Sequence, residues 1–343
     1  MINDFQQEIM NRKLALKEDI KRTAGNCSRM ILILGISVYI MGFAIILGVK
    51  IRGRILGIDI ASNPETNTIL GISSDAYKFL IGYLPCIIGD IIAIIIAMKT
   101  TNIKFKEDIF SRNKSPKMFI LLGTVSCIGT GMISSTIYAI YSTLLKIQGI
   151  TIPQPDLSFP SERVYLMLFL IYACFLGPIL EEIIFRGFIL KSMQKYGNLT
   201  AIIVSSILFS MFHLNLVQFA NPVLMGIVLA FIAIKSKSIV PSIIAHIFNN
   251  SITFIVLGIS LLKMPLVEWI FGITYFLAGV LALTLFVVKY GKDFMEAIKE
   301  NTKILKTYEK VRYAFSGKWA LTYIAFYVIL VVGSMIVTNV MKN

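Results

Sequence analysis

Two adjacent carboxylates and an arginine interrupt an apolar stretch, GPILEEIIFRGF, at residues 177–188. Each charge at the centre of a bilayer costs about 2.5 to 3.5 kcal/mol on insertion scales, so these side chains need compensation or a function. Residues four apart share a helix face, which predicts an ion pair between Glu182 and Arg186. Glu181 points about 100° away from Glu182 and keeps no local partner. The pattern therefore predicts one compensated carboxylate and one that is available as a general base.

The chain contains two histidines, and both fall within apolar runs. His213 closes the run FSMFH and shares a helix face with Phe209. His246 lies in SIIAHIFNNS, where Asn250 follows four residues later and projects from the same face. A histidine and an amide placed in this way could together donate hydrogen bonds to a developing oxyanion.

Each of these features also has a structural interpretation. The pair Glu182–Arg186 could serve only to neutralise charge, and a lone histidine in a span is often an interhelical hydrogen bonder. Asn249 and Asn250 point in different directions, so at most one of them faces a site. Asp90 is an isolated acid, for which a structural or water-facing role is favoured over catalysis. What favours one site is coincidence, because the two glutamates, both histidines and the asparagine fall on three spans within about seventy residues.

The elements that must position these side chains are membrane-spanning helices. The 343 residues are 56% hydrophobic and 15% charged, and their mean hydropathy of +0.78 lies far outside the range of soluble domains. Apolar runs of about 17 to 25 residues recur, which predicts an all-α polytopic bundle of about eight to nine spans and excludes a barrel. The predicted spans are 30–49, 79–98, 118–145, 164–190, 199–216, 220–235, 239–262, 268–289 and 319–338. Along these spans the candidate residues lie at levels spread over about two helical turns, which is compatible with one site opening toward the cytoplasmic half.

The net charge of +14 is explained by membrane topology rather than by nucleic-acid binding. Basic residues concentrate in 1–29, 99–117 and 289–318, which predicts that these segments are cytoplasmic, while 146–163 is external. The chain is thus expected in a cell membrane as a multi-pass protein with a cytoplasmic N-terminus and an uncleaved first span. The segment 289–318 is expected to be an amphipathic helix on the anionic surface. Four scattered cysteines without CxxC spacing indicate neither disulfides nor a zinc cluster.

The polar residues inside spans concentrate in one third of the chain, which suggests three regions. Residues 1–160 would form an N-terminal helix and three accessory spans, 161–262 the catalytic core, and 263–343 the C-terminal spans with their basic segment. The sequence carries no signal for the oligomeric state.

Three short motifs resemble those of a known family. EEIIFR is similar to the EExxxR motif, FSMFH to FxxxH and HIFNN to HxxxN of the CAAX-protease and bacteriocin-processing family of intramembrane endopeptidases, in the same order. Each motif alone is weak, but the three together, each on its own apolar run, are specific. The resemblance covers about residues 160 to 260.

The resemblance implies hydrolysis of a peptide bond within or near the membrane. Glu181 matches the glutamate that activates water, assisted by His213, whereas His246 and Asn250 match the residues that stabilise the oxyanion. Glu182 and Arg186 match the supporting charged pair. The extra spans at both ends depart from the family core and leave substrate access open.

Metal dependence and substrate are expectations of the same kind. Zinc could be held by Glu181, His213 and His246 with an open fourth position, but HExxH is absent, and we favour a metal-independent mechanism without a cofactor. The expected partners are the bilayer and a hydrophobic peptide or membrane-protein segment, in preference to a prenylated CAAX substrate. Two alternatives stay open: a non-catalytic scaffold or immunity protein of the same fold, and a proton-coupled transporter.

Overall fold

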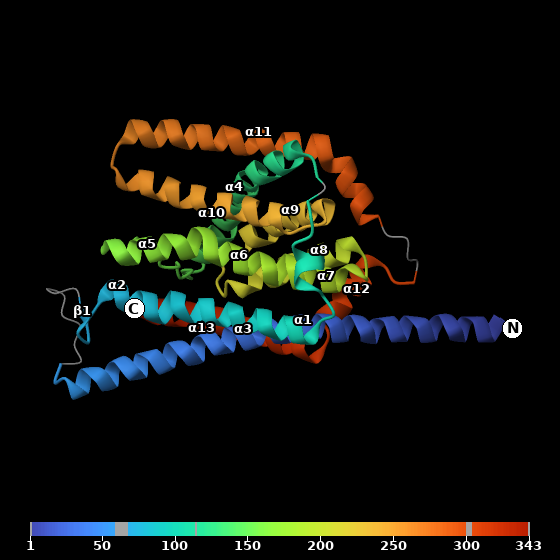
Figure 1. The fold of residues 1–343 in the computed structure, drawn as a ribbon, viewed down its shortest axis with the longest axis horizontal. Coiled ribbons are helices and arrows are strands. Elements are labelled where there is room, and N and C mark those ends of the chain that lie inside the picture. Colours follow the sequence, from blue (N-terminus) through green and yellow to red (C-terminus); the bar gives the residue numbers. More distant parts are fainter. Residues whose placement is uncertain (1, 59–67, 114, 300–303, 342–343) are drawn as a thin grey trace.

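The computed structural model describes residues 2–58, 68–113, 115–299 and 304–341. Of these residues, seven helices are long and apolar enough to cross a membrane, and two further apolar helices are shorter. The prediction of an all-α polytopic bundle is confirmed. Most helices run side by side along the long axis of the molecule, and the first half of the N-terminal helix projects beyond the bundle (Figure 1).

The chain begins with a long helix and a short hairpin. The elements before the matched motifs are α1 (Ile2–Ile55), β1 (Thr68–Ile69), β2 (Ile72–Ser73), α2 (Ser74–Lys78), a π-helical stretch (Phe79–Tyr83), α3 (Leu84–Thr100), a second π-helical stretch (Phe105–Ile109) and α4 (Lys117–Ile147). The two strands are antiparallel, with Thr68 opposite Ser73. Leu70 and Gly71 turn the hairpin with positive φ angles of 53° and 73°, as a tight two-residue turn requires.

The remaining elements carry the motifs and the C-terminal spans. They are α5 (Arg163–Ile171), a π-helical stretch (Tyr172–Leu176), α6 (Gly177–Glu182), another π-helical stretch (Ile183–Leu190), α7 (Lys191–Gln194), α8 (Asn198–Phe212), α9 (Ala220–Ser236), α10 (Val240–Leu261), α11 (Pro265–Ile298), α12 (Thr307–Ala314) and α13 (Lys318–Val340). The predicted spans correspond to α1, α2–α3, α4, α5–α7, α8, α9, α10, α11 and α13 in order.

The two short helices, α8 and α9, lie inside the bundle. The stretch 183–190 and α8 are buried along most of their length, with Phe185, Phe188 and Phe209 fully enclosed. Helices α4, α9 and α10 pack around this centre, whereas α11 and α13 expose many large apolar side chains. A helix that is apolar on all sides is suited to such a buried position.

The predicted span 199–216 extends too far, because α8 ends at Phe212. His213 is therefore the first residue beyond the helix rather than part of its interior. The turn that follows is built by Asn215, whose Nδ2 donates to the His213 carbonyl at 2.8 Å and whose Oδ1 accepts from the Gln218 N–H at 2.8 Å. Asparagine stabilises turns in this way, and no glycine or proline marks the break in the sequence.

The expectation of one amphipathic helix over 289–318 is wrong. Residues 289–298 continue α11, and α12 is a separate two-turn helix; residues 300–303 lie outside the described part of the chain. Helix α12 packs against α1 and α8, where the buried Lys310 donates from Nζ to the Tyr196 carbonyl at 2.9 Å. The mixed polar pattern of this segment thus reflects docking onto other helices.

Candidate active site

The two glutamates lie at the end of a short α-helix between two π-helical stretches. Tyr172–Leu176 precedes α6 and Ile183–Leu190 follows it. Pro178 lacks the N–H that would continue the preceding helix. A Cβ on Gly177 would approach the Tyr172 carbonyl oxygen to 3.1 Å. The Gly-Pro pair therefore permits the local change in helix winding, and π-helical turns of this kind occur often at functional sites.

The predicted ion pair is present and completely buried. Arg186 Nη1 lies 2.8 Å from Glu182 Oε1, and neither side chain is exposed. The guanidinium also lies 4.3 Å from the centroid of the Phe209 ring, a cation–π contact. Glu182 Oε2, Arg186 Nε and Arg186 Nη2 have no hydrogen-bond partner among the described residues. The pair is thus compensated in charge while part of its hydrogen-bonding capacity stays open.

His246 joins the two glutamates. Its Nδ1 lies 3.0 Å from Glu182 Oε1, and its Nε2 lies 3.6 Å from Glu181 Oε2. An ionised carboxylate only accepts hydrogen bonds, so Nδ1 carries the proton and Glu182 sets the orientation of the ring. The Glu181 side chain keeps 15% exposure against 0% for Glu182. A separation of 3.6 Å is longer than a hydrogen bond, so the Glu181 carboxylate is not tied to the ring.

His213 reaches the same region from the C-terminal end of α8. Its Nδ1 lies 2.9 Å from the Phe209 carbonyl oxygen, which leaves Nε2 as its second polar atom. The Phe209 ring stands edge-on between the two histidines, with centroid distances of 5.2 Å to His213 and 5.7 Å to His246. Within the described parts of the chain, His213 and Glu181 share an electrostatic interaction, but no hydrogen bond or ion pair joins them. The histidine nearest to Glu181 is His246.

Asn250 lies one turn beyond His246 on α10. Its Nδ2 donates to the Ala173 carbonyl at 3.0 Å, within the first π-helical stretch. Its Oδ1 accepts from Asn249 Nδ2 at 3.3 Å. One of the two amide protons of Asn250 thus braces the altered winding before α6, and the other has no acceptor among the described residues.

Asp90, for which the sequence favours a structural or water-facing role, lies near the candidate site. It lies on α3, which packs against α6, and its side chain interacts electrostatically with Glu181. The side chains of Tyr172 and Cys86 also interact electrostatically with Asp90 and Glu181. The sequence shows only that Asp90 is a lone acid in an apolar span. Its interaction with Glu181 depends on the packing of α3 against α6, which are far apart in the sequence.

The three candidate zinc ligands do not form a metal site in this arrangement. Among the described residues, no three His, Cys, Asp or Glu side chains are grouped so that they could hold a metal ion. Nδ1 of His246 and Nδ1 of His213 are each engaged with an oxygen of the protein. Neither leaves more than its Nε2 for any other ligand.

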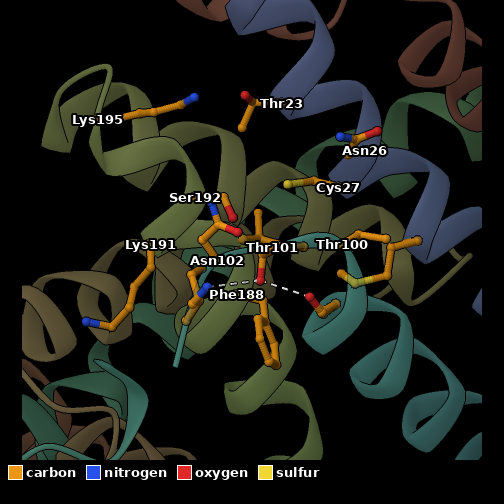
Figure 2. A pocket seen from close by; sticks show the side chains of 14 residues that line it. Thr23, Asn26, Cys27, Thr100, Thr101, Asn102, Phe188, Lys191, Ser192 and Lys195 are labelled. Atoms are coloured by element: carbon orange, nitrogen blue, oxygen red, sulfur yellow. Dashed lines mark hydrogen bonds between the residues drawn. The ribbon is translucent and has the colours of Figure 1, made fainter. Parts of the chain in front are cut away.

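A separate pocket of about 340 Å³ lies at the end of the bundle where α7 is found. Figure 2 shows the Thr101 hydroxyl near its middle, donating to the Ala97 carbonyl at 2.8 Å and accepting from the Ile103 N–H at 3.4 Å. Lys191 and Lys195 point in different directions rather than toward one point (Figure 2). The pocket is lined by residues of α1, α3 and the segments 101–103 and 188–195, and none of the six predicted site residues lines it.

The part of the chain that carries the three motifs is similar to known proteins. Residues 163–252 match the family model described as Type II CAAX prenyl endopeptidase Rce1-like. The chain is 36% identical over 91 residues to the "Putative membrane peptidase YdiL" of Bacillus subtilis (strain 168), covering 26% of this chain and 36% of that protein. It is 29% identical over 151 residues to an "Uncharacterized protein" of Mycoplasma capricolum, covering 41% of this chain and 43% of that protein.

These matches span between a third and a half of the length of the two relatives. No solved structure matches the chain significantly. The matched segment contains both glutamates, Arg186, both histidines and Asn250, but not Asp90. These matches support the resemblance for this part of the molecule: residues 163–252 are similar to the Rce1-like family and lie within a longer polytopic membrane chain.

Proposed function

We propose that the chain is an intramembrane endopeptidase that hydrolyses a peptide bond in a hydrophobic peptide or a membrane-associated protein. The observation that supports this most is the unequal treatment of the two glutamates. Glu182 is buried against Arg186 and His246, whereas Glu181 keeps some exposure and no hydrogen bond to the ring beside it. A general base needs this availability, because it must accept a proton from a bound water molecule.

In the proposed reaction, water attacks the carbonyl carbon of the substrate while Glu181 accepts a proton from that water. The tetrahedral intermediate carries negative charge on the former carbonyl oxygen. His246, oriented by Glu182 through Nδ1, would donate from Nε2 in its protonated form, and the second amide proton of Asn250 would add a donor. The C–N bond then breaks, and Glu181 returns its proton to the leaving amine.

His213 has a supporting role in this proposal. Its Nδ1–H is held by the Phe209 carbonyl, so Nε2 is the atom that would contact water near Glu181. No metal ion is needed in these steps, and each is assigned to side chains of the chain itself.

The test compares new peptide termini in membranes of cells that natively express the protein, measured by mass spectrometry. Glu181→Gln keeps the size of the side chain but removes its basicity, so cleavage products should fall at least about 100-fold. Glu162→Gln is the matched control, because Glu162 is an exposed residue before α5; it should leave the products unchanged.

The same cells separate catalysis from a scaffold role. Unchanged peptide termini in the Glu181→Gln strain, at normal protein abundance, would contradict the proposal. If deletion of the gene causes a phenotype and expression of the Glu181→Gln protein fully reverses it, a non-catalytic scaffold or immunity protein of this fold would be favoured instead.

A further inference from the structure

Asp90 is a buried acid, and one of its carboxyl oxygens has no hydrogen bond to the described residues. Its side chain is 1% exposed, and Oδ1 has no partner among the described residues. Burying a polar atom without a hydrogen bond is costly, and each such atom in a native structure requires an explanation. The chain tolerates this acid in the middle of α3, between two isoleucine-rich turns.

Asp75 shows how the same chain treats a structural acid. It is 6% exposed, at the start of α2, and its Oδ2 accepts from the Ser161 N–H at 2.7 Å and the Glu162 N–H at 2.8 Å. Those two bonds fasten the loop before α5. Asp90 Oδ1 makes no such hydrogen bonds to the described residues, so a purely structural role does not explain why an acid is buried at this position.

The surroundings of Asp90 connect it to the candidate active site. Helix α6 packs against α3 on one side and α10 on another, so Asp90 and His246 both reach the region of Glu181. Tyr172 also interacts electrostatically with Asp90 and Glu181, and its ring lies 5.4 Å from that of Tyr83. Glu181 thus lies 3.6 Å from a histidine of the matched segment and interacts electrostatically with an acid from outside it.

We propose that Asp90 is a substrate-binding residue whose Oδ1 accepts a hydrogen bond from a backbone N–H of the peptide held over Glu181. This inference rests on the proposed function and names a contact that deepens it. A carboxyl group keeps acceptor capacity whether it is ionised or protonated, so Oδ1 can take an N–H in either form. The contact would come from α3, outside the Rce1-like segment, and would be a feature of this chain's accessory helices.

The test measures binding without requiring cleavage. Full-length Glu181→Gln protein in lipid nanodiscs is titrated into dye-labelled decapeptides of leucine, valine and phenylalanine, and fluorescence anisotropy gives the affinity. Asp90→Leu should weaken binding about five- to tenfold, the effect of one hydrogen bond to a buried acceptor. Asp90→Asn keeps an acceptor oxygen and should retain most of the affinity.

A matched control is available in Ser206→Ala. Ser206 is also buried with an oxygen that has no partner among the described residues, but it faces Gly226 on α9 rather than α3. Replacing its hydroxyl should leave binding unchanged.

The thermal midpoint of Asp90→Leu should equal or exceed that of its parent, since an unpaired buried acceptor is removed. A lower midpoint would identify a structural acid and overturn the inference.

N-methylation of the peptide identifies the hydrogen bond itself. Methylating the contacted amide should weaken binding to the Asp90 protein but not to Asp90→Leu, so the two changes are non-additive. Additive effects at every position, equal affinity of the two proteins, or no binding to either would overturn the inference.

The failure of this inference and the failure of the proposed function can be told apart. Peptides that bind through Asp90 but are not cleaved by the wild type would contradict only the proposed function. Cleavage that is unaffected by Asp90→Leu would contradict only the inference.

Discussion

A single carboxylate oxygen, Glu182 Oε1, contacts both Arg186 and His246 at the centre of the molecule. It lies 2.8 Å from Arg186 Nη1 and 3.0 Å from His246 Nδ1. The free energy of a buried ion pair is a balance of large opposing contributions, but removal of one partner leaves the other charge uncompensated. Glu182 is therefore expected to matter for stability and for the orientation of His246, whereas Glu181 matters for chemistry.

At the residue scale, Glu182→Ala should lower the free energy of unfolding by about 3 to 5 kcal/mol, because Arg186 would remain as an unpaired buried charge. Glu181→Ala should have a much smaller effect, since its carboxylate has no hydrogen bond to the described part of the chain. Thermal midpoints of the purified proteins in one detergent check both. Glu182→Leu combined with Arg186→Met should recover most of the loss, and equal midpoints for the two single alanine variants would contradict this division of roles.

Much of the site was predictable at this scale because helix periodicity is local. The spacing of Glu182 and Arg186 predicted their pair, and the spacing of His246 and Asn250 predicted a shared face. The sequence could not show that Asn250 would use one proton on Ala173, or that His246 rather than His213 would lie nearest to Glu181. Those contacts depend on how distant helices pack against one another. The position of His213 depends also on the turn at Asn215, because α8 ends earlier than the apolar pattern indicates.

At the element scale, α6 depends on the changed winding on its two sides. The seven long apolar helices of the described residues were recognisable because apolar length is a strong signal. The π-helical stretches have no periodic signature, and only Gly177–Pro178 marked the position of one. The change in winding sets the direction of every side chain that follows, including both glutamates. Local geometry at Gly177 should therefore affect the distant contacts of Glu181.

Gly177→Ala tests this dependence, because the new Cβ would lie 3.1 Å from the backbone oxygen of Tyr172. We expect a loss of about 1 to 3 kcal/mol in the free energy of unfolding, the usual cost of forcing a methyl group into a packed site. Gly258→Ala on α10 is the matched control, since among the described residues no atom outside its own stretch of helix lies within 4 Å of the position that its Cβ would take. It should be neutral or slightly stabilising, because alanine favours helices over glycine. Equal loss in both variants would contradict a specific role for Gly177.

At the scale of the whole molecule, the basic segments gather at one end. The projecting half of α1 lies at the same end of the bundle as α7 and α12 (Figure 1). Asp19 of α1 accepts from Lys195 at 3.0 Å and from the Tyr196 hydroxyl at 2.7 Å, which fastens this end together. The opposite end carries the loop before α5, where Lys78 and Asp156 form an ion pair of 2.9 Å.

This distribution predicts the orientation of the chain in the membrane. Because lysine and arginine favour the cytoplasmic side, the end with α7 and α12 should face the cytoplasm and the loop before α5 the exterior. In a variant without the four native cysteines, Ser158→Cys and Ser316→Cys place matched exposed thiols at the two ends. A membrane-impermeant maleimide should label the first in intact cells and the second only after permeabilisation. The reverse pattern would invert the orientation and would place the pocket of Figure 2 on the outer side, while equal labelling in intact cells would show that the two ends are not separated by the membrane.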